Sequence, residues 1–331
     1  MRRKQRQTTL DRGEAGQAAS GQRGIALIAV LWIMVVLALL AANLTRSTRT
    51  SNYLARNLVA GAEARALADA GVYRAVAGLM ERLPNRRLAV DGTRYRIAFA
   101  EGEVLLSLQD EGGKIDLNRS PAVMLVALFR TVGIDEEASV ALADAVLDYR
   151  DRDHDRHLNG AEDDDYRRAG LSHGAKDGPF EAIEELRHVL GMSEALYQQV
   201  LPAITVFGRG RRVNQATAPP LVLRALPGIA EAALVERLQA REARSENSTT
   251  LDEGGDAEDG ADLATPRRGA RFGSAVTITA EARTAKGVVF IREAVVRPSA
   301  RAARRAGAPE RPYQILAWRE GRAPDAAAAP E

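Results

Sequence analysis

An uncharged run of apolar residues near the N-terminus constrains this chain more than any other feature. The run covers residues 25–44, reads IALIAVLWIMVVLALLAANL, and contains no Asp, Glu, Lys or Arg. As an α-helix it would be about 30 Å long, which is the thickness of the hydrocarbon core of a bilayer. The sequence therefore predicts a transmembrane helix over residues 25–44.

A basic segment, residues 1–24, precedes this run. It carries Arg2, Arg3, Lys4, Arg6, Arg12 and Arg23 against Asp11 and Glu14. Positive charge before a first transmembrane helix favours a cytoplasmic N-terminus, so we expect the bulk of the chain on the other side of the membrane. A secretory signal peptide is the alternative, because residues 41–43 resemble a cleavage site, although its apolar core would be only about 7–15 residues long.

The sequence shows none of the usual signs of an enzyme. It contains no cysteine, which excludes disulfides, zinc sites built on cysteine and a cysteine nucleophile. It has no nucleophile elbow, phosphate loop or metalloprotease helix. Ser172 and His173 are adjacent, which is not the arrangement of a catalytic triad. We therefore expect a protein without catalytic activity.

The pattern behind the apolar run predicts an α+β fold. Small and apolar residues recur every three or four positions up to residue 80, so a helix is expected over residues 25–83, ending before Pro84. Alternating residues predict strands at 95–99 and 104–108, and again at 276–281, 288–296 and 313–318. Each set is too small to stand alone, so residues 84–114 and 273–320 are expected to form one antiparallel sheet with the helix packed on it.

The residues between the two sets of strands, 115–245, have a helical pattern with an internal repeat. Each copy places Ser120 or Thr217 before a proline, as a predicted helix cap, and ends in a Gly-Ile turn. This pattern is typical of helix-hairpin-helix units, which in many proteins hold a DNA phosphate. The second loop lacks another glycine and has no basic cluster with aromatics around it, so we favour a packing unit and expect no nucleic acid. DNA binding stays as the alternative.

A loop after the predicted helix 136–149 has the spacing of a calcium-binding loop, residues 151–165. Counted from Asp151, oxygen ligands stand at positions one, three, five, seven, nine and twelve, as in an EF-hand. Arg156 stands where the sharp turn usually needs glycine. The alternatives are a solvated acidic loop, or a transition-metal site at His154 and His157. The candidate ligands are Asp151, Asp153, Asp155, the carbonyl of His157, Asn159 and Glu162, with Asp163 and Asp164 as further candidates.

Two segments have the composition of flexible chain. Residues 246–272 are rich in Asp, Glu and Gly and predict an acidic linker. Residues 321–331 predict a disordered tail.

The motifs in combination resemble the minor pseudopilin K family of type II secretion systems, also called general secretion pathway protein K. Each motif is weak by itself, but their order is specific. They are RGIAL at 23–27, GKIDLN at 113–118, NGAED at 159–163, FEAIEEL at 180–186 with GM at 191–192, and VN at 213–214 with LPG at 226–228.

This resemblance implies that a prepilin peptidase cleaves after Gly24 and methylates the new N-terminus at Ile25. It implies a pilin-like fold with a large inserted α-helical domain of the helix-hairpin-helix or SAM-like type, and calcium at the loop described above. The implied partners are minor pseudopilins I and J, other pseudopilins and the inner-membrane assembly platform, with the secretin or an exoprotein as further candidates. The implied location is the inner membrane, crossed once, with the C-terminal domain in the periplasm and later at the tip of a pseudopilus.

The fifth residue of the processed chain would be Ala29. Most pilin-like proteins carry a glutamate there, which is taken to pair with the N-terminal amine of a neighbour, because an unpaired carboxylate in hydrocarbon is costly. Its absence is a trait of the pseudopilin K family, and a subunit without it needs no partner above it. A signal-anchored protein that never needed this carboxylate, and a minor type IV pilin-like subunit, are the alternatives.

Overall fold

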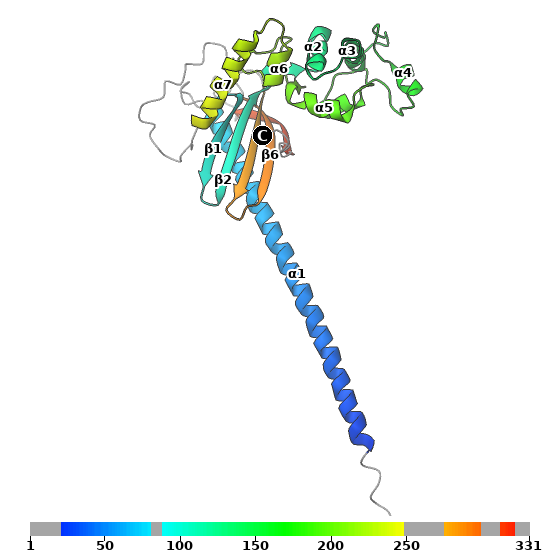
Figure 1. The fold of residues 1–331 in the computed structure, drawn as a ribbon, viewed down its shortest axis with the longest axis vertical. Coiled ribbons are helices and arrows are strands. Elements are labelled where there is room, and N and C mark those ends of the chain that lie inside the picture. Colours follow the sequence, from blue (N-terminus) through cyan, green and yellow to red (C-terminus); the bar gives the residue numbers. More distant parts are fainter. Residues whose placement is uncertain (1–20, 81–87, 248–274, 299–311, 322–331) are drawn as a thin grey trace, which may run out of the picture. The chain divides into compact units, whose positions relative to one another are not determined.

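The computed structural model describes residues 21–80, 88–247, 275–298 and 312–321 (Figure 1). Most of the predicted leader, linker and tail, and the helix stop at Pro84, lie outside these residues. The chain divides into two compact units, Met1–Val59 and Ala60–Glu331. Helix α1, Gly21–Leu79, contributes residues to both.

The first unit consists, in its described part, of the apolar half of α1. The window Ala26–Asn43 has a mean hydropathy of 2.6, and none of it is buried. Apolar surface of this extent is unfavourable in water. Among the described residues this is the one helix long and apolar enough to cross a membrane, in agreement with the prediction for residues 25–44.

The second unit contains a five-stranded antiparallel sheet with the order β1-β2-β5-β6-β7. Strand β2 pairs directly with β5 over its whole length, from Gly102↔Thr284 to Asp110↔Val276. The strands predicted before and after the helical segment therefore form one sheet, as expected. The strands are β1 (Asp91–Phe99), β2 (Gly102–Asp110), β5 (Val276–Thr284), β6 (Val289–Pro298) and β7 (Tyr313–Glu320).

The C-terminal part of α1 packs against this sheet. Leu67, Val72 and Val76 of the helix are buried in one apolar cluster with side chains of β2 and β5. A Cβ atom at Gly71 would lie 2.7 Å from Cγ1 of Val104. Glycine at this position therefore permits the close approach of helix and strand.

Residues 111–247, between β2 and β5, form a mainly helical segment with its own apolar core, which includes the buried rings of Phe129, Tyr166 and Tyr197. The α-helices are α2 (Ala122–Thr131), α3 (Glu136–Arg150), α4 (Asp163–Arg168), α5 (Glu194–Val200), α6 (Pro220–Ala225) and α7 (Glu231–Asn247). Three 3-10 turns complete it, η2 (Glu111–Gly113), η3 (Ile183–His188) and η4 (Leu201–Ala203).

Two short strands depart from the expectation of an entirely helical segment. Strand β3 (Ile115–Asp116) pairs in parallel with β4 (Ile204–Thr205). The backbone N–H of Leu117 also donates to the carbonyl of Thr205 at 2.8 Å. These bonds satisfy buried backbone groups just after the chain leaves the five-stranded sheet.

Local predictions in the segment need correction. Ser120 and Thr217 do not cap their helices, because α2 and α6 begin after Pro121 and Pro219, with no side-chain cap. A residue before proline is held in extended backbone, which places the helix start beyond it. Within the predicted helical region 115–245, the FEAIEEL motif leads into a 3-10 turn, η3 (Ile183–His188), rather than an α-helix.

A buried glutamate joins the sheet to the helical segment. Glu111 is 2% exposed, directly after β2. Its Oε1 accepts hydrogen bonds from Oγ1 of Thr277 on β5 at 2.6 Å and from Nζ of Lys114 at 2.7 Å. Its Oε2 accepts from Oγ1 of Thr205 on β4. These three donors together offset the cost of removing the carboxylate from water. If one donor is lost, the buried charge is no longer fully compensated, so the link between the sheet and the helical segment depends on all three.

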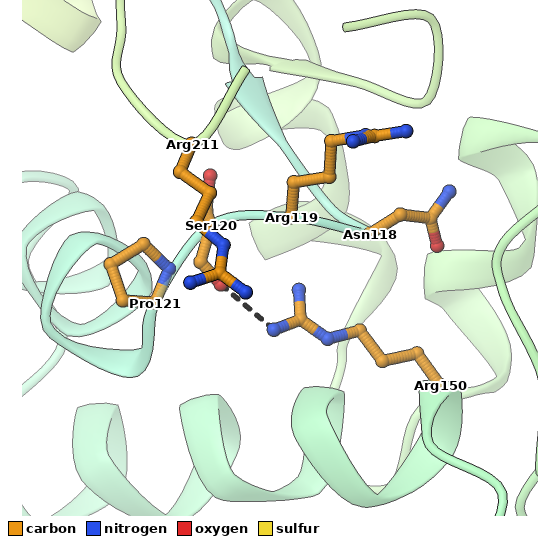
Figure 2. A pocket seen from close by; sticks show the side chains of 6 residues that line it. All are labelled: Asn118, Arg119, Ser120, Pro121, Arg150 and Arg211. Carbon is orange, nitrogen blue, oxygen red and sulfur yellow. Dashed lines mark hydrogen bonds between the residues drawn. The ribbon is translucent and has the colours of Figure 1, made fainter. Parts of the chain in front are cut away.

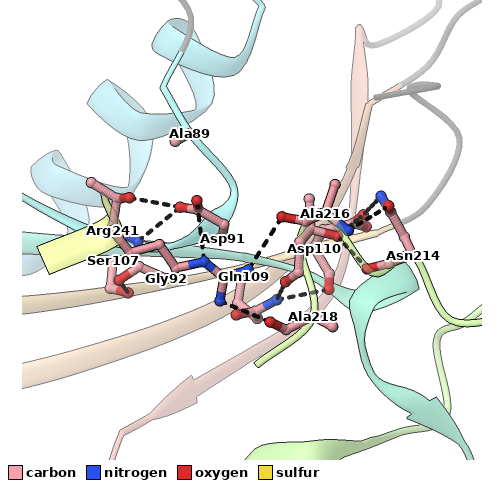
Figure 3. Close-up of polar contacts among 12 residues, drawn as sticks. Ala89, Asp91, Gly92, Ser107, Gln109, Asp110, Asn214, Ala216, Ala218 and Arg241 are labelled. Carbon is pink, nitrogen blue, oxygen red and sulfur yellow. Dashed lines mark hydrogen bonds and ion pairs between the residues drawn. The ribbon is translucent and has the colours of Figure 1, made fainter. Parts of the chain in front are cut away.

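A second group of polar contacts lies at the same junction (Figure 3). Oδ2 of Asp110 accepts from Nδ2 of Asn214 at 3.2 Å and from Oγ1 of Thr217 at 2.9 Å. Arg241 of α7 forms an ion pair with Asp91 of β1 at 3.5 Å. The end of the helical segment is thereby attached to the first two strands.

We expect the substitution Thr277→Val to lower the free energy of unfolding by about 1.5–3 kcal/mol, because a hydrogen bond to a buried charged group is lost. The measurement is denaturant unfolding of the full chain in detergent. Thr279→Val on the same strand is the matched control, since Thr279 makes no side-chain hydrogen bond among the described residues. Equal loss in both variants would contradict the role of Glu111.

Candidate metal centre

Four carboxylates gather where α3 ends and α4 begins; we call them the acidic cluster. Asp148 lies in the last turn of α3, Asp151 directly follows it, Glu162 directly precedes α4, and Asp177 lies in the loop beyond α4. Oxygen atoms of Asp148 and Asp151 lie within 4.8 Å of each other, as do those of Glu162 and Asp177.

Five oxygen atoms of the acidic cluster are buried without a hydrogen-bond partner among the described residues. They are Oδ2 of Asp148, Oδ1 of Asp151, both carboxylate oxygens of Glu162, and Oδ1 of Asp177. Buried polar atoms without partners are costly, and convergent carboxylates repel one another. A calcium ion takes six to eight hard oxygen ligands, so these residues fit a hard divalent cation.

The mutual repulsion shows in the acid–base properties of the cluster. Burial, together with the charges of Asp148, Asp177 and Asp151, raises the pKa of Glu162 from 4.5 to about 7. Burial and the charge of Asp153, followed by that of Asp148, raise the pKa of Asp151. A cation among these groups would favour their ionised forms and lower both pKa values.

Backbone features of the surrounding loops fix the positions of Asp148 and Asp177. A Cβ atom at Gly160 would collide with Oδ2 of Asp148, so glycine is required where the loop passes this carboxylate. The N–H of His157 donates to Oδ1 of Asp148 at 3.1 Å, and Nδ1 of the same histidine contacts that oxygen. Asp177 has a φ of 54°, the left-handed region that non-glycine residues seldom adopt.

The structure brings only part of the predicted ligand set to the acidic cluster. Asp151 and Glu162 belong to it. Asp153 instead accepts a hydrogen bond from the N–H of Asp155 at 3.1 Å, and both residues are exposed. The carbonyl of His157 accepts from the N–H of Gly160 at 3.1 Å, so this turn is closed by a backbone bond.

The later candidates are engaged elsewhere. The side-chain nitrogen of Asn159 donates to Asp144 at 3.4 Å. Oδ1 of Asp163 accepts from the N–H of Ala175 at 3.1 Å. The exposed Asp164 pairs with Arg167 one turn along α4, an ion pair of little energetic weight at the surface.

Sequence reasoning missed Asp148 and Asp177. Asp148 precedes Asp151 by three residues on a helix, which places both side chains on one face; this signal was readable. Asp177 reaches the cluster only because the loop after α4 folds back, and no spacing rule indicates that.

The histidines do not make the cluster a typical transition-metal site. His157 adjoins the pair of Asp148 and Asp151, and His154 lies 3.5 Å from Oδ2 of Asp177. Each group thus contains one imidazole among carboxylates, and both rings are exposed. Carboxylate-rich sites suit calcium, magnesium or manganese better than zinc or copper.

Both copies of the sequence repeat form a pair of helices joined by a tight turn. Gly133 between α2 and α3, and Gly228 between α6 and α7, have φ values of 93° and 82°. The first turn leads into Asp135, Glu136 and Glu137 at the start of α3. Three acidic residues at the position that would meet a phosphate disfavour DNA.

The predicted processing and assembly positions lie at the start of α1. Gly24 and Ile25 are in its first turns, and Ala29 follows with its side chain exposed.

Residues 105–209 match the family model of type II secretion system protein K. We call this matched segment the protein K domain. It contains the whole acidic cluster, β3, β4 and the first of the two helical hairpins.

Curated relatives of the protein K domain carry the same name. Type II secretion system protein K of Klebsiella pneumoniae is 30% identical over 173 residues, which cover 47% of this chain and 52% of that protein. The protein of that name from Pseudomonas aeruginosa is 32% identical over 144 residues, covering 39% and 43%. The chain thus spans about half the length of the curated relatives it matches.

A solved structure is also similar. It is the crystal structure of the GspK-GspI-GspJ complex from the type 2 secretion system of enterotoxigenic Escherichia coli, with 16% sequence identity and a TM-score of 0.47. The match covers 83% of this chain and 99% of that chain.

Proposed function

We propose that this chain is a non-enzymatic minor pseudopilin of a type II secretion system. The observation that carries the proposal is the protein K domain on the same chain as an apolar helix able to cross a membrane. The curated relatives are named for the same system. In this role the chain supports export across the outer membrane as a structural subunit.

The proposal includes a pilin-like architecture and one membrane crossing. The long α1 packed on an antiparallel sheet supports a pilin-like fold, and the helical segment between β2 and β5 supports an inserted domain. The basic leader supports a cytoplasmic N-terminus, with the second unit in the periplasm. Cleavage after Gly24, methylation of Ile25, and a place at the pseudopilus tip permitted by Ala29 complete the proposal.

Calcium is the proposed ligand of the acidic cluster. Asp148, Asp151, Glu162 and Asp177 would hold it, since each has at least one buried oxygen without a hydrogen-bond partner among the described residues. The ion would offset the repulsion between the converging carboxylates and tie the end of α3 to the start of α4. Its role is to stabilise the protein K domain.

Minor pseudopilins I and J are the proposed direct partners, with other pseudopilins, the assembly platform, the secretin and exoproteins as further contacts. Full-length chain co-expressed with I and J and solubilised in detergent should elute with both as one complex. The matched control is co-expression with I and J of a chain that lacks residues 21–59, which keeps the part of α1 that packs on the sheet. Elution of the chain alone, while I and J elute together, would contradict the proposal.

The DNA-binding alternative is the weaker one on structural grounds, because acidic residues surround the first hairpin turn. A minor type IV pilin-like subunit would share the fold, and neighbouring genes for pseudopilins would separate it from the favoured function. Salt-sensitive binding of duplex DNA by the full chain would support the DNA alternative.

A further inference from the structure

A pocket of about 740 Å³ opens beside the start of α2. Figure 2 shows the side chains around it, which come from the loop before α2, the end of α3 and the loop after β4. None of them belongs to the acidic cluster. The lining residues are Asn118, Arg119, Ser120, Pro121, Arg150 and Arg211.

The pocket has an excess of positive charge. Arg150 is held in place by the carbonyls of Leu117 and Ser120, the latter at 2.8 Å. Arg119 is half exposed, and its Nε lies 3.8 Å from the carboxylate of Asp116. Arg211 is exposed and makes no ion pair with any described residue. The three guanidinium groups therefore outnumber the carboxylates of Asp116 and Asp151, which are the acidic side chains that act on Arg150.

The wall of the pocket offers one hydroxyl donor. Helix α2 has ten residues and begins directly after Pro121, which lines the pocket, with no side-chain cap. Ser120 also lines the pocket, and although the residue as a whole is only 3% exposed, its hydroxyl forms no hydrogen bond with any described residue. This hydroxyl can therefore donate to a ligand in the pocket.

We propose that this pocket binds a carboxylate of an acidic peptide segment on a partner protein. Guanidinium groups bind carboxylates through paired, charge-assisted hydrogen bonds, and the start of a helix favours negative charge. Arg119 and Arg211 contact the carboxylate from the open side, and the hydroxyl of Ser120 donates to it from the pocket wall. Arg150 positions the loop and adds charge.

The size and surroundings of the pocket favour a peptide over a nucleic acid. A volume of about 740 Å³ exceeds one carboxylate and suits a side chain with its flanking residues. Helix α2 is about 15 Å long, and beyond its other end lie Asp135, Glu136 and Glu137, which would repel a neighbouring phosphate. The choice of a protein as the partner rests on the proposed function. The prediction that the pocket binds a carboxylate does not depend on that function.

The test measures fluorescence anisotropy of a labelled tetrapeptide with two glutamates, titrated with the purified full chain in detergent. A peptide with glutamine at both positions is the ligand control. The double variant Arg119→Gln, Arg211→Gln removes the open-side charges, and Ser120→Ala removes only the hydroxyl. Arg224→Gln is the matched protein control, because Arg224 is exposed on α6 and does not line the pocket.

The expected result is saturable binding of the glutamate peptide alone, at least tenfold weaker in the double variant and about threefold weaker in Ser120→Ala, with Arg224→Gln unchanged. Equal binding of both peptides, unchanged binding by the double variant, or no saturation would overturn the proposal. Displacement by inorganic phosphate at lower concentration than by acetate would also overturn it, in favour of a phosphate site. Co-purification with I and J tests the proposed function separately, so the two can fail independently.

Discussion

Calcium is expected to raise the melting temperature of the full chain by roughly 5–10 °C when present at about one hundred times its dissociation constant. The triple variant Asp148→Asn, Asp151→Asn, Glu162→Gln should show no such shift, because three of the four ligand carboxylates are neutral. Thermal unfolding in detergent with calcium or with a chelator measures both. The variant should still fold, since its amides no longer repel one another.

The matched control is Asp164→Asn. Asp164 belongs to the sequence-predicted ligand set but is exposed and pairs with Arg167 outside the acidic cluster. This variant should keep the full calcium shift. Loss of the shift in Asp164→Asn, or its survival in the triple variant, would contradict the ligand set proposed from the structure.

The calcium shift should also be larger at pH 8 than at pH 6. In the calcium-free fold Glu162 has a pKa of about 7, above its ordinary 4.5. Its proton therefore stabilises the folded state at low pH, and this contribution is lost as the pH rises through about 7. At pH 8 the ionised carboxylate is destabilising until a cation binds it, whereas at pH 6 the cation must displace the proton. An equal shift at both values would count against Glu162 as a ligand.

Replacing Gly24 with valine is expected to leave the chain entirely as the precursor, with its 24-residue leader attached. The proposed peptidase must approach the backbone at the bond after Gly24, and a branched side chain there obstructs that approach. Mass spectrometry of the membrane fraction measures the outcome, since the mature chain would begin at Ile25 with a methylated amine.

Gly21→Val is the control for this experiment. Gly21 lies three residues before the proposed site, at the first residue of α1, and its replacement should not impair cleavage. A Gly24→Val chain with the mass of the mature form would show that cleavage does not need Gly24, which would contradict a prepilin peptidase. The precursor mass in the chain with Gly24 intact would instead support an uncleaved anchor.

Much of the fold could be read from the sequence because it depends on local periodicity. The apolar run over residues 25–44 and the alternating pattern of each strand are properties of short stretches, and each is found where it was expected. The single sheet could be predicted because each of the two sets of strands is too small to be stable alone. The helix caps were misassigned, since Pro121 and Pro219 moved the helix starts beyond Ser120 and Thr217.

The candidate metal centre was only half readable. A spacing rule finds residues that one loop brings together, and it found Asp151 and Glu162. It assumes, however, that alternate residues of the loop turn inward, whereas Asp153 and Asp155 are exposed and Asn159 donates to Asp144. Asp163 and Asp164 were candidates beyond this spacing, and they bond to Ala175 and Arg167 instead.

By itself the sequence determined the helix that is apolar enough to cross a membrane, the interrupted sheet and the general place of the acidic loop, because each depends on neighbours within a few residues or on apolar content. Only the tertiary structure decided which carboxylates meet, since Asp177 reaches Glu162 through the path of a loop rather than through spacing. The same holds for the pocket at α2, where Arg119, Arg150 and Arg211 come from three separate elements. Their positive charges lie close together only because the packing of the helical segment places these three elements around one pocket.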